Sequence, residues 1–306
     1  MNSRVSALWV GQKERGSALL MATIVRIALM LGRPAAAALL YPICAYFLLF
    51  SGAARRASRD YLARVLGRSP RWRERFHHYH VFAATILDRV FLYTGRVRAF
   101  RCELTGADTL RTIIAAKRGC LLFGAHFGSF DALRAVGLDE CPVPIRVLMH
   151  ERHAQKMTRV LGRLNTALPA QVIPLGRPQT MLDVRDALAR GDIVALLADR
   201  SLYGDRTVPC TLLGAPAHLP RGPFDLAALL DAPVMLFSAT WLGRMRYDIR
   251  FEPLDEPGGT APASVEARCA RFAAWLEARC RAAPYNWFNF YDFWAAAEPP
   301  VVERRT

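Results

Sequence analysis

The stretch GCLLFGAHFGSFDALRAVG, residues 119–137, contains the main signals for the fold. The apolar run CLLF is short enough for a buried strand, and FDALRAVG after it has the apolar spacing of a helix. Gly124 and Gly128 lie between these two segments and supply the backbone freedom that a turn needs. The stretch therefore predicts a strand, a turn and a helix in succession, as in a parallel sheet.

Strand-like and helix-like segments alternate in the same way from about residue 98 onward. Expected strands are PIRVLMH (144–150), QVIPLG (171–176), IVALLAD (193–199), VMLFSATW (234–241) and YDIRFEPL (247–254); expected helices are AQKMTRVLGRLN (154–165), TMLDVRDALARG (180–191), GPFDLAALLD (222–231) and SVEARCARFAAWLEARCR (264–281). This order predicts an α/β domain with a mainly parallel sheet that helices cover on both faces.

The N-terminal region is the most apolar part of the chain. Residues 16–32 carry one charge, Arg26, and residues 34–54 carry none. A membrane-spanning helix needs roughly 20 apolar residues, so the second run is long enough, although Pro42 is expected to kink it. A signal peptide and a buried helical hairpin are the alternatives. We expect a membrane anchor, spanning or interfacial, in residues 1–56 and a catalytic-type domain in residues 57–306.

A surplus of basic residues follows this apolar region. Lys and Arg number 41 against 26 Asp and Glu, which gives a formal charge of +15, and the arginines are densest between Arg55 and Arg75. Such a charge favours an anionic partner, and beside an apolar segment it favours anionic phospholipid headgroups on the cytoplasmic side. The seven cysteines form no CxxC pair, which indicates reduced thiols in a protein that faces the cytosol.

Residues 58–93 have helical spacing and include three histidines, His77, His78 and His80. Glu74 precedes His78 by four positions, a spacing that a metal site can use. His77 and His78 are adjacent and point to different faces of a helix, so we interpret them as part of a polar helix face and expect no metal.

His126 and Asp131 are the candidate catalytic pair. Ligands of α/β sheets collect at the carboxyl ends of the strands, where His126 is expected. On one continuous helix the two side chains would lie roughly 140° apart, but a turn between them allows Asp131 to fold back onto the imidazole. A histidine that a carboxylate orients is suited to general-base catalysis. The alternative is a helix-capping aspartate beside a structural histidine.

The string HFGSFD at 126–131 resembles the HX4D/E signature of the lipid A late acyltransferase (lauroyl/myristoyl acyltransferase) family. The resemblance extends to the apolar N-terminus, to LLADRSLYGDR at 196–206 and to APYNWF at 283–288. Glycerolipid acyltransferases share the histidine motif, but their second block, similar to FPEGTRS, is absent from this sequence. The lipid A branch is therefore preferred.

This resemblance implies a glycerolipid-acyltransferase-like fold at the bacterial inner membrane, with the domain facing the cytoplasm. It implies transfer of a fatty or polyketide-like acyl chain from an acyl carrier protein thioester to a hydroxyl or amine of a lipid acceptor. His126 would be the general base and Asp131 would stabilise the imidazolium, without a cofactor or a covalent intermediate. Expected substrate-binding residues are Gly128, Ser129, Arg152, Asp199, Arg200 and Arg206.

The C-terminal segment YNWFNFYDFW, residues 285–294, is dense in aromatic side chains. It suits the wall of an acyl channel, a membrane-interface belt or simple core packing. Basic residues commonly follow the tryptophan in the family and do not follow it here, which leaves room for an acceptor without a phosphorylated sugar.

Two other classes of protein fit parts of this sequence. The charge alone would suit a nucleic-acid-binding protein, but the sequence has no spacing typical of that class, and we expect no nucleic acid partner. A non-catalytic lipid-binding or scaffold protein is the stronger alternative, because it keeps the anchor and lacks only the chemistry.

Overall fold

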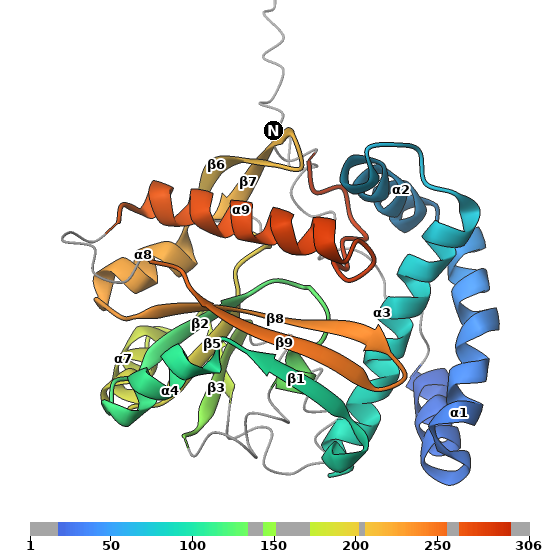
Figure 1. Cartoon of the computed structure of the whole chain (residues 1–306), viewed down its shortest axis with the longest axis horizontal. Coiled ribbons are helices and arrows are strands. Elements are labelled where there is room, and N and C mark those ends of the chain that lie inside the picture. Colours follow the sequence, from blue (N-terminus) through green and yellow to red (C-terminus); the bar gives the residue numbers. More distant parts are fainter. Residues whose placement is uncertain (1–17, 134–142, 151–171, 202–205, 256–262, 295–306) are drawn as a thin grey trace, which may run out of the picture.

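A computed structural model describes residues 18–133, 143–150, 172–201, 206–255 and 263–294 (Figure 1). The helices are α1 (Ala18–Phe50), α2 (Gly52–Leu66), α3 (Trp72–Tyr93), α4 (Ala107–Ala115), α7 (Thr180–Ala189), α8 (Gly222–Leu229) and α9 (Val265–Ala282), with a 3-10 turn at Val97–Ala99. The strands are β1 (Arg101–Thr105), β2 (Cys120–Gly124), β3 (Ile145–His150), β4 (Val172–Leu175), β5 (Ile193–Leu197), β6 (Thr207–Leu212), β7 (Ala215–Pro220), β8 (Val234–Gly243) and β9 (Arg246–Pro253).

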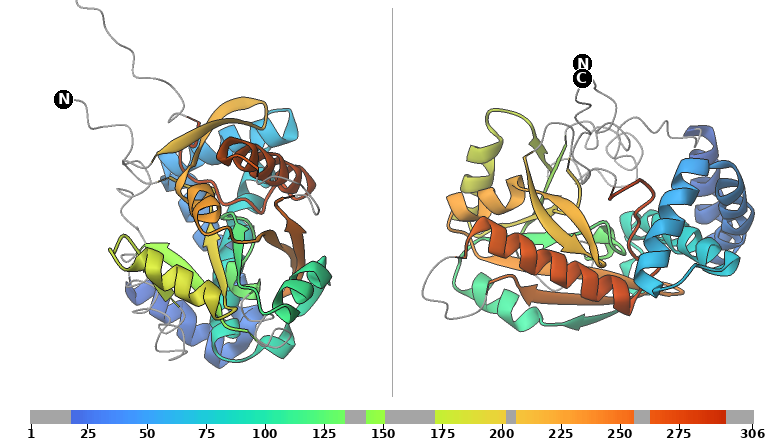
Figure 2. Two further views of the ribbon diagram at one scale, coloured as in Figure 1. Left: turned by 90° about the vertical axis from the view of Figure 1, so that its left-hand side faces the viewer. Right: turned by 90° about the horizontal axis from the view of Figure 1, so that it is seen from above.

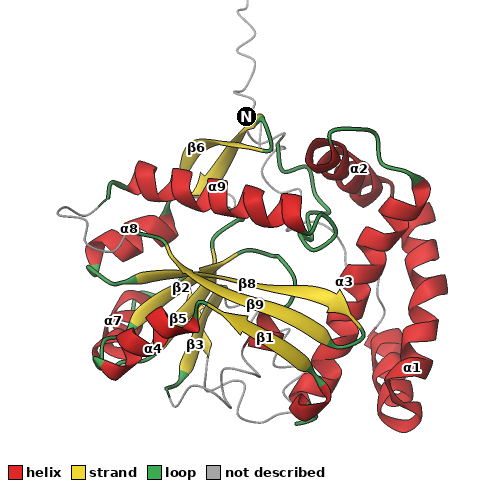
Figure 3. Ribbon diagram, in the orientation of Figure 1, coloured by secondary structure: helices red, strands yellow, loops and turns green. Residues whose placement is uncertain are grey.

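A seven-stranded sheet in the order β1-β9-β8-β2-β5-β3-β4 forms the centre of the molecule (Figure 3). Strands β8, β2, β5, β3 and β4 are mutually parallel, and β9 with its parallel neighbour β1 runs in the opposite direction. The prediction of a mainly parallel α/β sheet is confirmed. The sequence interpretation missed β1, α4 and the antiparallel β6–β7 hairpin, which the alternating pattern did not include.

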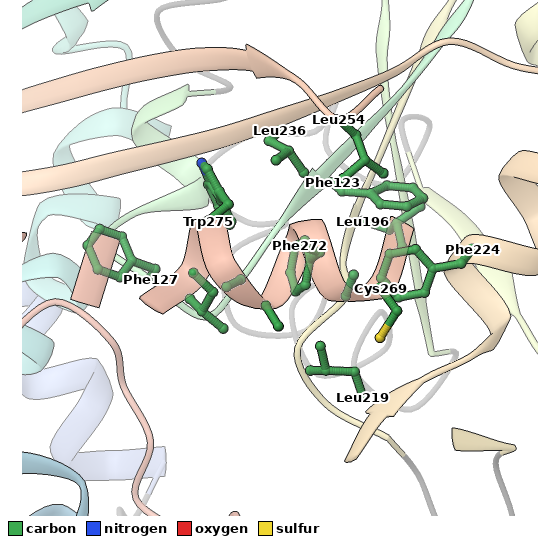
Figure 4. Packing of buried hydrophobic residues seen from close by; sticks show 14 of the residues in the cluster. Phe123, Phe127, Leu196, Leu219, Phe224, Leu236, Leu254, Cys269, Phe272 and Trp275 are labelled. Atoms are coloured by element: carbon green, nitrogen blue, oxygen red, sulfur yellow. The ribbon is translucent and has the colours of Figure 1, made fainter. Parts of the chain in front are cut away.

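Each face of the sheet has its own hydrophobic core, because successive side chains of a strand point to opposite faces. Leu121 and Phe123 of β2 belong to the core beneath α8 and α9, where Phe224 and Phe272 pack near Phe123 (Figure 4). The intervening Leu122 belongs to the core on the α1 and α3 side. Both faces of β2 are fully buried, which explains its unbroken apolar sequence.

Helices α1, α2 and α3 stand together at one end of the sheet (Figure 2). Helix α1 is interrupted at Gly32, whose φ of 82° and ψ of 174° are not helical, whereas the backbone at Pro42 stays helical. The break therefore lies just before Pro34, and the kink expected at Pro42 does not interrupt the helix. Thr23–Phe50 is long and apolar enough to cross a membrane by length and composition.

Beyond the break, α1 buries one stripe and exposes the opposite side. The buried residues recur every fourth position: Ala36, Leu40, Cys44 and Leu48. Residues four apart lie on one face of a helix, and this face belongs to the core cluster that also contains residues of α3. The second half of the apolar run is thus docked lengthwise on the domain.

A buried ion pair fixes the break in α1. Arg33 Nε donates to Oδ1 of Asp88 on α3 at 2.7 Å, and Asp88 is fully buried. The other carboxylate oxygen accepts from Tyr247 Oη at 2.9 Å and from Trp241 Nε1 at 3.2 Å. Burial raises the pKa of Asp88, and the hydrogen bonds and charge of Arg33 oppose that shift. One carboxylate therefore joins α1, α3 and the β8–β9 hairpin.

The three histidines of α3 have different surroundings. His77 is exposed, His80 is half-buried among Tyr41 and Trp241, and His78 is fully buried. His78 Nδ1 lies 2.8 Å from Ser58 Oγ on α2, and Nε2 lies 2.8 Å from the carbonyl oxygen of Trp287. His78 thus joins α2, α3 and the segment after α9.

We predict that Arg33→Leu lowers the free energy of unfolding by about 3 kcal/mol, because it leaves Asp88 buried without its cation. Arg26→Leu is the matched control, since Arg26 is exposed on the same helix, and it should change stability by less than about 0.5 kcal/mol. Denaturant titration in detergent micelles measures both. Equal effects of the two substitutions would contradict the role of the ion pair.

His78 should make the fold sensitive to acid. Burial lowers the pKa of His78 from 6.5 to about 4, so the unfolded chain binds a proton at a higher pH than the folded chain does. Stability should therefore fall as the pH drops from about 6.5 to about 4, by about 3 kcal/mol in total. Denaturation at a series of pH values should show a shallower decline in His78→Gln. An identical decline in both proteins would disprove this account.

Candidate active site

The candidate site forms where two central strands end side by side. Strands β2 and β5 are parallel neighbours, with Gly124 in register with Leu197. His126 lies two residues beyond the first strand, and Asp199 lies two residues beyond the second. The amide of Ala198 donates to the carbonyl of Gly124 at 2.8 Å, which continues the pairing past both strand ends. The equal offsets therefore bring the histidine and the aspartate together.

Asp199 holds His126 through two hydrogen bonds. Its Oδ1 lies 2.8 Å from Nδ1 of the ring, and its Oδ2 accepts from the main-chain amide of His126 at 3.1 Å. Oδ2 also accepts from Nε1 of Trp287 at 3.0 Å. The Asp199 side chain is fully buried, whereas 35% of the His126 side chain is exposed. This arrangement fixes one edge of the imidazole and leaves part of the ring at the surface.

The surroundings of Asp199 keep it ionised. Burial by itself raises the pKa of this carboxyl, but the charge and hydrogen bond of His126, the charge of Arg200 and the indole of Trp287 outweigh burial. The pKa of Asp199 consequently lies well below its usual range. A carboxylate can only accept hydrogen bonds, so Nδ1 of His126 must carry the proton between them.

Two glycines let the loop around His126 pass close to its neighbours. At Gly128, φ is +62° and a Cβ would lie 1.8 Å from the carbonyl oxygen of Ala239. At Gly124, a Cβ would lie 2.4 Å from the ring of Phe237. Gly128 therefore fills a turn that no other residue fits, as expected, while Gly124 is required by packing.

The segment after α9 clamps this loop from the other side. The amide of Gly128 donates to the carbonyl of Asn286 at 2.7 Å, and the amide of Phe288 donates to the carbonyl of His126 at 2.9 Å. The side-chain oxygen of Asn286 accepts from the amide of Trp241 at 2.8 Å, which ties the same segment to β8. His126 is consequently held through its backbone as well as its ring.

The expectation that Asp131 folds back onto His126 is wrong. Asp131 is buried in a helical turn that begins at Phe130, where one oxygen accepts from the hydroxyl of Tyr93 and the other pairs with Arg89 Nε at 2.6 Å. Both partners lie on α3. The strand ends bring Asp199 to Nδ1 of His126 instead, because neighbouring parallel strands meet there while the turn directs Asp131 toward α3.

The expected substrate-binding residues have different surroundings in the described structure. Ser129 is fully buried and caps the turn, since its Oγ accepts from the amide of Ala132 at 3.1 Å. Arg200 donates to the carbonyl of Phe288 at 2.7 Å and lies over the ring of Tyr291. Arg206 is exposed at the start of the β6–β7 hairpin, and Arg152 lies outside the described residues.

The aromatic C-terminal segment packs into the core. Trp287 is 1% exposed and packs edge-on against Tyr61, Phe293 and Trp294. In its described part, the segment forms one isolated bridge, between Phe127 and Trp287. Besides its backbone contacts with the loop, it contributes the indole N–H that donates to Asp199.

Sequence reasoning missed the link between His126 and Asp199, although it named both residues. The signal was available: each residue stands two positions after a buried apolar strand, and equal offsets at adjacent parallel strands bring side chains together. The contacts of Trp287, Arg89 and Tyr93 had no such signal, because they come from segments far apart in the chain.

Comparison with known proteins identifies the family of this chain. No curated protein matches the chain. A family model described as bacterial lipid A biosynthesis acyltransferase matches residues 13–295, which includes both the histidine loop and the Trp287 segment. The chain therefore belongs to the bacterial lipid A biosynthesis acyltransferase family.

Proposed function

We propose that this protein is a membrane-associated acyltransferase that moves a fatty acyl chain from an acyl carrier protein thioester to a hydroxyl or amine of a lipid acceptor. Membership of the family implies an acyltransferase with an acyl donor and a lipid acceptor. The observation that carries the mechanism is the hydrogen bond between His126 Nδ1 and the buried carboxylate of Asp199. We assign His126 as the general base and Asp199 as the residue that orients it.

This pairing determines which ring nitrogen reacts. Because Nδ1 keeps its proton and donates a hydrogen bond to Asp199, the neutral ring carries its lone pair on Nε2. The His126 side chain is 35% exposed, whereas the Asp199 side chain is shielded from solvent. The carboxylate fixes the tautomer and stabilises the imidazolium that forms, as in other histidine-carboxylate pairs.

The transfer balances without a cofactor. Nε2 removes the proton from the acceptor hydroxyl or amine while its oxygen or nitrogen attacks the thioester carbonyl carbon. The tetrahedral intermediate collapses, the carbon–sulfur bond breaks, and the leaving thiolate takes the proton from the imidazolium. The products are an acylated lipid and a free carrier thiol, and the histidine returns to its neutral state.

Membrane association at the inner membrane, with the domain in the cytoplasm, is supported by the surface of α1 and α2. Large apolar side chains near the end of α1 are exposed: Tyr46 51%, Leu49 53% and Phe50 61%. Arg56 and Arg59 are exposed on α2, which begins two residues later. An apolar surface bordered by cations suits an anionic bilayer, and the described cysteines are free thiols, which suits a cytosolic domain.

His126→Ala and Asp199→Asn should each lower kcat by about 10³- to 10⁴-fold, because the first removes the base and the second removes its orientation. The assay follows thiol release from a long-chain acyl carrier protein with total bacterial membrane lipid, and mass spectrometry identifies the acylated product.

Asp192→Asn is the matched control for Asp199→Asn. Asp192 is also buried beside β5, but it precedes the strand and pairs with Arg146 at 3.0 Å. The folded fraction of this variant should keep the wild-type kcat. Unchanged turnover in His126→Ala would refute the assignment of the base, and binding of donor and lipid without any turnover of the wild type would indicate a non-catalytic lipid-binding protein.

Leu49→Glu with Phe50→Glu should weaken binding to anionic vesicles by about a hundredfold or more, since burial of each such side chain is worth about 1.5–3 kcal/mol. Leu229→Glu is the control, because Leu229 is 72% exposed on α8, away from this surface. Vesicle flotation measures the binding. Equal binding of all three proteins would exclude the end of α1 from the membrane contact.

A further inference from the structure

His78 is buried and packs against aromatic rings. It is 0% exposed, its ring stacks on Phe290 with centroids 4.6 Å apart, and Tyr61 packs against it at 5.5 Å. An imidazole loses hydration when it enters such a site, and polar contacts must offset that loss. The contacts with Ser58 and with the carbonyl of Trp287 are therefore what distinguishes His78 from a phenylalanine at this position.

The partners of His78 specify its tautomer. The carbonyl oxygen of Trp287 can only accept, so Nε2 of His78 must carry a proton. Burial lowers the pKa of His78 to about 4, so the ring is neutral and Nδ1 accepts from the hydroxyl of Ser58. Ser58 therefore selects the form of His78 that donates to Trp287.

Trp287 transmits this contact to the reactive histidine. Its carbonyl is held by His78 and by the amide of Asn289, and its indole N–H donates to Oδ2 of Asp199. Asp199 in turn holds the ring and the amide of His126. A continuous series of hydrogen bonds thus runs from Ser58 on α2 to the candidate base at the end of β2.

We propose that His78 is a positioning residue, which sets the orientation of His126 through Trp287 and Asp199. This inference rests on the proposed function of His126 as a base. Its consequence is that α2 and α3, the helices next to the apolar α1, contribute to the geometry of the site through Ser58 and His78. His78 does not contact the substrate in this scheme.

The test uses the full-length protein and three single variants. His78→Phe keeps the ring packing and removes the donor, and it should lower kcat by about 10- to 100-fold with KM changed less than about twofold, as expected for a misplaced base. His78→Gln places an amide N–H near the position of Nε2 and should recover most of the activity. His80→Phe is the matched control on the same helix and should behave as wild type.

A double-mutant cycle separates positioning from general loss of structure. If His78 acts through Asp199, then His78→Phe should have little further effect on kcat in an Asp199→Asn background. Two fully multiplicative effects would overturn the proposal, as would a wild-type kcat in folded His78→Phe. In His78→Phe the buried hydroxyl of Ser58 loses its partner, which can prevent folding. If this variant does not fold, the double variant Ser58→Ala with His78→Phe takes its place, because it replaces both hydrogen-bond partners with apolar groups.

A spectroscopic measurement tests the same series without turnover. In protein labelled with ¹⁵N at histidine and tryptophan, His78→Phe should move the indole resonance of Trp287 and the Nδ1 resonance of His126, and His80→Phe should move neither. Unmoved resonances in folded His78→Phe would refute the positioning role. If the resonances move in His78→Phe but the wild-type protein has no acyltransferase activity, the hydrogen-bond series is supported and the proposed function is rejected.

Discussion

The buried carboxylate of Asp199 is the constraint around which the site is built. It accepts from the amide and the ring of His126 and from the indole of Trp287, three donors from two segments. A buried charge is tolerated in a protein when such donors replace the lost water, and here they also keep the group ionised. The parallel register of β2 and β5 makes this possible, because it delivers the acid and the histidine to one edge of the sheet.

Helix α3 connects this edge to the apolar N-terminal region. Adjacent residues on a helix point about 100° apart, so Asp88 and Arg89 contact different parts of the structure. Asp88 pairs with Arg33 at the break of α1, and Arg89 pairs with Asp131 beside the histidine loop. Ten positions before Asp88, His78 reaches the carbonyl of Trp287. The same helix therefore contacts the apolar N-terminal helix α1, the loop that carries His126 and the segment after α9.

The sequence predicted much of the architecture and less of the site. The apolar strands and α2, α3, α7, α8 and α9 were found from their spacing, because their periodicity reflects which faces are buried. The β6–β7 hairpin was missed, since Pro209 and Pro216 interrupt its pattern. The predicted position of His126 beyond a strand end is confirmed, but Asp131 was paired with it because the two are close in the sequence, whereas the ring of His126 contacts Asp199. Proximity in the sequence predicts side-chain contacts poorly in a sheet, because residues far apart in the chain come together on neighbouring strands, which lie about 4.7–4.9 Å apart.

The pairing of Asp131 with Arg89 and Tyr93 has a chemical consequence for His126. Each negative charge beside an imidazole stabilises the protonated ring, and a base that stays protonated at neutral pH cannot accept the proton of an acceptor hydroxyl. Asp199 already supplies one such charge at 2.8 Å. The guanidinium of Arg89, 2.6 Å from Asp131, neutralises the second carboxylate of the motif and keeps it directed toward α3. Under the proposed function, Asp199 orients the base, while Asp131 anchors the loop to α3.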